Sequence, residues 1–138
     1  MLLDTHVWRW HAAGNDARIG RRARREIDRS AAAGALVVSV ASMFELTALS
    51  AAGRLQLVPS AESWIRQSIE FGRMQVAEIT AAIAIEAGSI PTSALADPMD
   101  RLLVATARAW DVPIVTRDAA IREYVTAQGG LRAIDVSR

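Results

Sequence analysis

Five acidic side chains lie close to the ends of short apolar runs. Some follow such a run at the beginning of a helical pattern, and others lie at the start of the helix that precedes the next apolar run. They are Asp4, Glu45, Asp97, Asp100 and Asp118. Because ligands of parallel α/β sheets bind outside the carboxyl ends of the strands, we expect these acids to meet at one edge of a sheet. Clustered carboxylates resist ionisation unless a cation neutralises them, and Mg²⁺ or Mn²⁺ does so with oxygen ligands. The pattern therefore predicts a divalent-metal site at which activated water hydrolyses a phosphodiester bond.

Each acid also has a structural interpretation as part of a helix cap. Asp118 and Asp97 precede helical patterns and fit N-caps, with Asp100 as an acid of the first turn. The Ser-Met-Phe-Glu pattern that ends at Glu45 fits a capping box. Asp4, directly after an apolar run expected to be a central strand, has no evident structural reason to be there. Independent caps that all converge on one edge are a weaker explanation than one shared site.

Composition excludes several other chemistries. The 138 residues are 51% hydrophobic and 22% charged, which is typical of a globular protein. The chain has no cysteine, and all 16 of its basic residues are arginine. Cysteine nucleophiles, thiolate metal sites, a P-loop lysine and Schiff-base chemistry are therefore excluded. The missing lysine also excludes response-regulator receivers and haloacid-dehalogenase-like phosphatases, which carry an aspartate after their first strand.

The positive charge is unevenly distributed along the chain. Residues 18–29 hold six arginines against two acids, although the net charge is only +1. Guanidinium groups pair with phosphate oxygens, so this run suits contact with nucleic acid. A solvated helix face or a partner-binding face explains it at least as well. His6, close to Asp4, could contact substrate or metal, but a structural role is the favoured interpretation.

Short apolar runs alternate with longer helical patterns, which predicts an α/β fold with a mostly parallel sheet. Strands are expected at 2–3, 36–40, 74–79, 112–116 and 131–136. Helices are expected from about His6, along the arginine-rich run to Gly34, from Ser39 or Ser42 to Gly53, and over 61–71, 80–88, 97–110 and 119–127. The helix over 61–71 carries Trp64, Ile65, Ile69 and Phe71 at helical spacing. The first strand is so short that we expect it to begin upstream of Met1.

The sequence predicts no membrane segment. No apolar run approaches the roughly 18 residues that a span requires. The N-terminus has neither a basic region nor a cleavage-like site, so no secretory signal is expected. These observations predict a cytoplasmic protein without membrane association.

Four short motifs occur in a fixed order along nearly the whole chain, from position 3 to position 118. They are Leu3-Asp4-Thr5-His6-Val7-Trp8, Ser39-x-x-Ser42-Met43-Phe44-Glu45-Leu46, Asp97-Pro98-Met99-Asp100-Arg101-Leu102-Leu103-Val104-Ala105 and Ile114-Val115-Thr116-Arg117-Asp118. Each is weak alone, but the ordered set is specific. Together they resemble the PIN-domain ribonucleases, and most of all the VapC toxins of bacterial and archaeal toxin–antitoxin pairs.

The resemblance implies a single PIN-like nuclease domain over residues 1–138, built as a three-layer α/β/α sandwich around a mostly parallel sheet of four to five strands. It implies Mg²⁺- or Mn²⁺-dependent hydrolysis of RNA by the toxin of a toxin–antitoxin pair. The implied partners are an RNA substrate and a small VapB-like antitoxin, in a homodimer or a toxin–antitoxin hetero-oligomer. A non-catalytic RNA- or protein-binding PIN-like module and a housekeeping PIN nuclease are the alternatives.

The resemblance also implies which residues form the site. Asp4 and Glu45 take the first two acidic positions and Asp118 takes the fourth. Thr116 would support the site through its hydroxyl group. Phe44 stands where many relatives have Trp, a departure expected to affect only packing.

The third acidic position is ambiguous between two neighbouring aspartates. The pattern Asp-x-Leu-hydrophobic-hydrophobic-Ala favours Asp100. Asp97 belongs to the acidic Asp-Pro-x-Asp-Arg variant of the same motif. Asp100 is the preferred candidate of the two.

Overall fold

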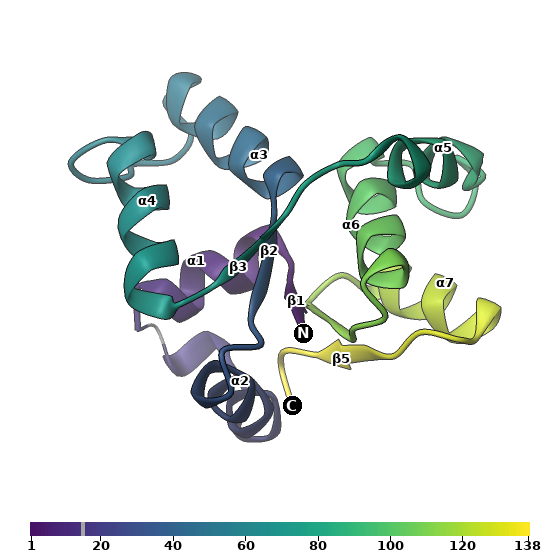
Figure 1. Cartoon of the computed structure of the whole chain (residues 1–138), viewed down its shortest axis with the longest axis horizontal. Helices are drawn as coiled ribbons and strands as arrows, with labels where there is room; N and C mark the ends of the chain where they lie inside the picture. Colours follow the sequence, from purple (N-terminus) through teal and green to yellow (C-terminus); the bar gives the residue numbers. More distant parts are fainter. Residues whose placement is uncertain (15) are drawn as a thin grey trace.

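Five short strands lie at the centre of the molecule, with helices on both faces of the sheet (Figure 1). The computed structural model describes residues 1–14 and 16–138. The strands are β1 Leu2–Leu3, β2 Val37–Ser39, β3 Gln75–Ala77, β4 Ile114–Thr116 and β5 Ala133–Asp135. The helices are α1 Thr5–Ala12, the short 3₁₀ helix η1 Asp16–Arg18, α2 Arg21–Ala32, α3 Val40–Ala51, α4 Ala61–Gly72, α5 Ala81–Ser89, α6 Pro98–Ala109 and α7 Ala119–Gln128.

The sheet has the strand order β3-β2-β1-β4-β5, and every neighbouring pair is parallel. This confirms the predicted α/β class with a parallel central sheet. The chain builds outward from β1 to β2 and β3, and then returns to place β4 and β5 on the other side of β1. The order therefore reverses between β1 and β4. In open parallel sheets this reversal opens a crevice at the carboxyl ends of the strands.

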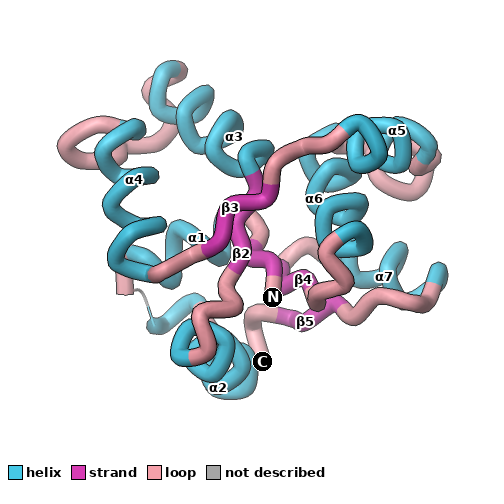
Figure 2. The backbone as a smooth tube through the Cα atoms, viewed as in Figure 1, coloured by secondary structure: helices cyan, strands magenta, loops and turns pink. Residues whose placement is uncertain are grey.

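Alternate residues of each strand face opposite layers, as the two-residue period of a strand requires. Leu3, Val38 and Val115 join the apolar cluster beneath α1 to α4. Their neighbours Leu2 and Ile114 join a second cluster beneath α6 and α7. Figure 2 shows the sheet between these two groups of helices. The result is the predicted three-layer α/β/α sandwich.

The second strand passes directly into α3, which decides between the two predicted N-caps, Ser39 and Ser42. Ser39 is the N-cap, and its hydroxyl accepts a hydrogen bond of 3.0 Å from the backbone N–H of Ala41. The alternative capping box between Ser42 and Glu45 is therefore wrong, because both residues lie inside the helix. The buried Ser42 hydroxyl instead accepts a hydrogen bond of 2.9 Å from Thr5, which joins α3 to α1.

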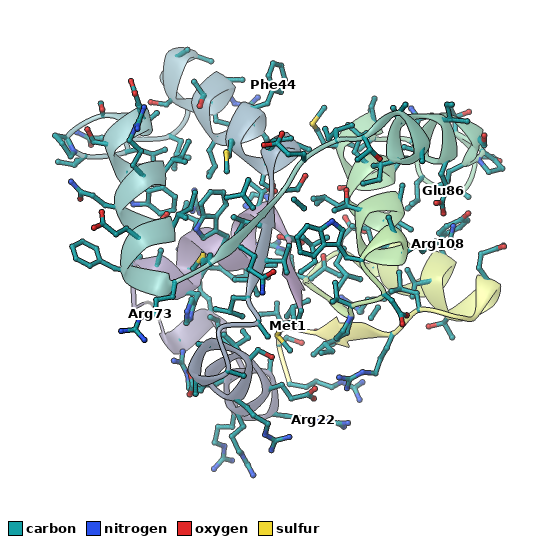
Figure 3. All side chains as sticks on the ribbon, viewed as in Figure 1. Met1, Arg22, Phe44, Arg73, Glu86 and Arg108 are labelled. Atoms are coloured by element: carbon teal, nitrogen blue, oxygen red, sulfur yellow. The ribbon has the colours of Figure 1, made fainter. Side chains whose placement is uncertain are left out.

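Four predicted strands are longer than the observed ones, because apolar residues continue beyond the strand ends. Leu36 and Met74 are buried just before β2 and β3 without belonging to them. Two aromatic side chains of the helical patterns lie at the surface instead. Phe71 is 83% exposed, and Phe44, at the outer side of α3 (Figure 3), is 67% exposed. The expectation that Phe44 matters only for packing is therefore wrong, since it takes no part in the core.

The N-terminal residue is integrated into the fold. The Met1 ammonium group donates a hydrogen bond of 2.6 Å to the carbonyl of Ala35, and burial lowers its pKa. A strand that begins upstream of Met1 stays a prediction. Among the residues that the structure describes, no helix is long and apolar enough to cross a membrane.

Candidate functional site

The five acids predicted from the sequence line one cavity at the carboxyl ends of β1 and β4. The cavity has a volume of about 470 Å³. Its lining is Asp4, Thr5, His6, Glu45, Asp97, Asp100, Leu103, Arg117 and Asp118. It lies where the strand order reverses, which is the place that the topology offers to a ligand.

Asp4 is held by both of its carboxylate oxygens. One oxygen caps α1, accepting hydrogen bonds of 2.8 Å and 3.2 Å from the backbone N–H groups of His6 and Val7. The other accepts a hydrogen bond from the Thr116 hydroxyl. The side chain is only 5% exposed. Asp4 therefore has a structural role that sequence reasoning missed, because the helix begins immediately after a two-residue strand.

Thr116 joins the ends of β1 and β4. Its fully buried hydroxyl donates to Asp4 and accepts a hydrogen bond of 2.9 Å from the backbone N–H of Asp118. One hydroxyl thus fixes the positions of two acids that come from distant parts of the chain. This contact is compatible with the supporting role that the resemblance implies for Thr116.

Asp97 and Asp118 are helix caps as well as cavity residues. Asp97 precedes Pro98 and accepts a hydrogen bond of 2.8 Å from Met99 N–H at the start of α6. Asp118 accepts one of 3.1 Å from Ile121 N–H at the start of α7. Both predicted caps are confirmed. Each cap uses one carboxylate oxygen, so capping does not prevent the other oxygen from binding a ligand.

Asp100 is the acid whose ionisation the cavity disfavours. It lies in the first turn of α6 and is partly buried. Burial raises its pKa from 3.8 to about 7, helped by the negative charges of Asp97, Asp118, Asp4 and Glu45 in that order. A bound cation would reverse this effect, because it would stabilise the carboxylate form.

The cavity fits a hard divalent cation by the chemistry of its donors. All five acids offer oxygen, the element that Mg²⁺ and Mn²⁺ prefer. Within residues 1–14 and 16–138, however, no three acidic or histidine side chains are placed to hold one ion as they stand. Hydrogen bonds to caps and to Thr116 direct several of the carboxylates elsewhere. Ion binding would therefore require these side chains to turn toward a common point.

A group of side chains that gathers on Trp10, including Arg117 from the lining of the cavity, was not expected from the sequence. The guanidinium carbon of Arg117 lies 5.6 Å from the centre of the Trp10 ring, and that of Arg18 lies 5.6 Å from the same ring. His6, which is exposed, stacks on Trp10 with a centroid distance of 6.1 Å. The sequence feature that could have indicated a role for Arg117 was its position between Thr116 and Asp118.

Comparisons with known proteins agree with this architecture. Residues 1–126 match the family model described as PIN domain. The chain is 35% identical over 124 residues to Ribonuclease VapC22 of Mycobacterium tuberculosis (strain ATCC 25618 / H37Rv). This match covers 90% of the chain and 91% of that protein.

Solved structures of toxin–antitoxin complexes share the fold. VapBC2 from Rickettsia felis, bound to a promoter DNA fragment, superposes with a TM-score of 0.67 at 14% identity, covering 97% of this chain and 96% of that one. DNA-bound VapBC from Salmonella typhimurium gives 0.63 at 18% identity, with the same coverage. A toxin–antitoxin complex from Klebsiella pneumoniae gives 0.58 at 15% identity and covers 94% and 93%. The chain belongs to the PIN-domain family and is similar to the VapC ribonucleases within it.

Proposed function

We propose that the chain is a divalent-metal-dependent endoribonuclease whose active centre is the carboxylate cavity. The observation that carries this proposal is the convergence of five acids from four segments on one cavity at the reversal point of the sheet. Asp4, Glu45, Asp100 and Asp118 are the proposed metal-site acids, and Thr116 supports them. Asp97 is the alternative to Asp100 at the third position. The proposed nuclease unit spans residues 1–138.

The preference for Asp100 over Asp97 has a physical basis. Asp97 is exposed and caps α6, so its position already has a structural explanation. Asp100 is partly buried among like charges, a costly arrangement that a cation would relieve. Perturbed carboxylates in a cavity are typical of functional sites.

A bound Mg²⁺ or Mn²⁺ would supply two things, a lowered pKa for a bound water and polarisation of a phosphoryl oxygen. The protein's own residues provide the position and the charge. Asp4 is held by two backbone amides and the Thr116 hydroxyl, so the other acids of the cavity would have to turn toward it to share a cation. Asp100 would lose its proton from the carboxyl group as the cation enters. Metal uptake near neutral pH should therefore release a proton.

RNA is the proposed substrate because Ribonuclease VapC22 is a similar protein over almost its entire length. The solved complexes of the same fold contain VapB-type partners, which supports a small VapB-like antitoxin as partner of this chain. We propose that the chain is the toxin of such a pair and acts in the cytoplasm. A homodimer or a toxin–antitoxin hetero-oligomer is the proposed assembly.

Cleavage of a labelled RNA by the purified chain tests this function. Wild type should cut in Mg²⁺ or Mn²⁺ and be inactive in excess EDTA, and Asp100→Asn should lose at least 100-fold in rate. The matched control is Asp28→Asn, which removes a carboxylate from an exposed position on α2 outside the cavity. It should cut like wild type. Binding of RNA without any cleavage would instead favour a non-catalytic binding module.

A further inference from the structure

We propose that Arg117, held against the indole of Trp10, binds a phosphodiester group of the RNA strand at the mouth of the carboxylate cavity. This inference rests on the proposed ribonuclease function and adds a substrate-binding residue to it. Arg117 would be a catalytic-site residue that contacts substrate, and Trp10 would be a positioning residue that acts through it.

Arg117 is anchored in the loop that carries two other residues of the site. It stands between Thr116 and Asp118, and its side chain lines the cavity. Its carbonyl oxygen accepts a hydrogen bond of 2.6 Å from the Arg122 guanidinium, which fixes the loop to α7. The backbone is therefore held while the side chain stays exposed. A ligand in the cavity can reach this guanidinium directly.

The guanidinium of Arg117 is not used to neutralise the acids beside it. Among the side chains that the structure describes, no carboxylate forms an ion pair with Arg117. The guanidinium instead lies 5.6 Å from the centre of the Trp10 ring. An exposed contact of this kind contributes about 0.5–1 kcal/mol. The stack holds the side chain beside the acids, and its N–H groups are available to bind both oxygens of a phosphate.

The Trp10 ring does not depend on Arg117 for its packing, because other residues also cover it. The ring is only 5% exposed, and Arg18 and His6 also lie against it. Two guanidinium groups beside one indole repel each other, and an anion nearby would remove that cost. Arg18 opens the arginine-rich run 18–29, so the positive charge continues away from the cavity along the chain.

A guanidinium group at the mouth of the carboxylate cavity would help an anionic phosphodiester to approach the acids. Five carboxylates repel an approaching RNA strand, and one divalent cation would neutralise only part of their negative charge. A cation at the mouth offsets the repulsion for a neighbouring phosphate of the same strand. Phosphate contacts of this type position a nucleic acid without reading its sequence.

Salt dependence of RNA binding tests the inference. The parent protein is the full-length Asp100→Asn variant in Mg²⁺, which prevents cleavage during the titration of a fluorescent single-stranded RNA oligonucleotide. Arg117→Ala is introduced into this parent. Arg117→Lys keeps the charge but loses the bidentate geometry. The matched control is Arg54→Ala, which removes an exposed arginine that does not line the cavity.

The slope of log Kobs against log[salt] is negative, and loss of one phosphate contact should decrease its magnitude by about 0.7 for a single strand. Arg117→Ala should show this decrease together with weaker binding, and Arg117→Lys should keep the slope while binding less tightly. Arg54→Ala should match the parent. An unchanged slope in Arg117→Ala, an equal decrease in Arg54→Ala, or a parent that binds no RNA would overturn the inference.

The two proposals fail in different ways. Wild type that cleaves RNA while Arg117→Ala keeps the parent slope leaves the nuclease function intact and refutes only the role of Arg117. Wild type that cleaves no RNA in Mg²⁺ or Mn²⁺ refutes the nuclease function, and the slope measurement still decides whether Arg117 binds a phosphate.

Discussion

Replacing Asp100 by Asn should change how the stability of the metal-free protein depends on pH. The substitution removes the carboxylate charge and keeps the size of the side chain. Burial and four neighbouring acids raise the pKa of Asp100 to about 7 in the folded protein, whereas the ordinary pKa of this carboxyl group is 3.8. Because the folded-state pKa is the higher one, the contribution of Asp100 to stability is complete below pH of about 4. It is lost as the pH rises through about 7.

The size of the effect follows from the difference between the two pKa values. The rise in the pKa of Asp100 from 3.8 to about 7 corresponds to a loss of about 4 kcal/mol in the free energy of unfolding over the full pH range. Only part of this range lies between pH 5 and pH 8, and water in the open cavity screens the charges. We therefore expect wild type to lose about 1–2 kcal/mol more free energy of unfolding over this interval than Asp100→Asn does.

Urea unfolding in EDTA, followed by fluorescence of the four tryptophans, measures this difference. Wild type and Asp100→Asn should have nearly equal free energies of unfolding at pH 5, whereas the variant should be the more stable protein at pH 8. The exposed Asp28→Asn provides the control and should follow wild type. Equal pH dependence in wild type and Asp100→Asn would refute the argument that the cavity disfavours the carboxylate form.

Two further perturbations test contacts around the cavity by urea unfolding, a third tests an exposed ring on α4, and a fourth tests the response of the cavity to metal. Thr116→Val removes the hydroxyl that joins Asp4 to Asp118 and should lower the free energy of unfolding by about 1–3 kcal/mol, whereas Thr116→Ser should retain most of it. Asp97→Ala should cost about 1 kcal/mol through loss of the α6 cap, and Asp97→Asn should cost far less; equal losses would exclude the cap as the cause. Phe71→Ser should stay within about 0.5 kcal/mol of wild type, because the ring is 83% exposed, and a larger loss would contradict its position. Mg²⁺ at 100 times its Kd should stabilise wild type by about 2.7 kcal/mol, measured as a rise in Tm in thermal melts. A Tm that does not change on addition of Mg²⁺ would argue against a metal site.

Local patterning was sufficient to predict most of the fold. The alternation of apolar runs and helical patterns predicted all five strands and their parallel arrangement, because helices between strands bring each strand back in the same direction. Gly34 and Gly53 follow α2 and α3 with positive φ angles of 64° and 70°, as their use as helix stops predicts. Strand ends were less predictable, since Leu36 is buried like its strand neighbours although it lies before β2.

The sequence predicted which acids line the cavity but not the contacts that hold them. Strand ends determine which acids meet, so their positions in sequence were informative. Whether a carboxylate is also held by a backbone amide depends on where the helix begins, and this was misjudged at Asp4. The stack of Arg117 on Trp10 joins residues that are far apart in sequence, and no local pattern indicates such a contact.

Titration of the metal-free protein with Mn²⁺ measures whether the carboxylate cavity holds a divalent cation. If it does, wild type should bind Mn²⁺ with saturation by calorimetry and release protons near pH 7. Asp100→Asn should bind at least ten-fold more weakly, and the exposed control Asp28→Asn should match wild type. Absence of saturable binding to wild type, or equal affinity in wild type and Asp100→Asn, would contradict the account.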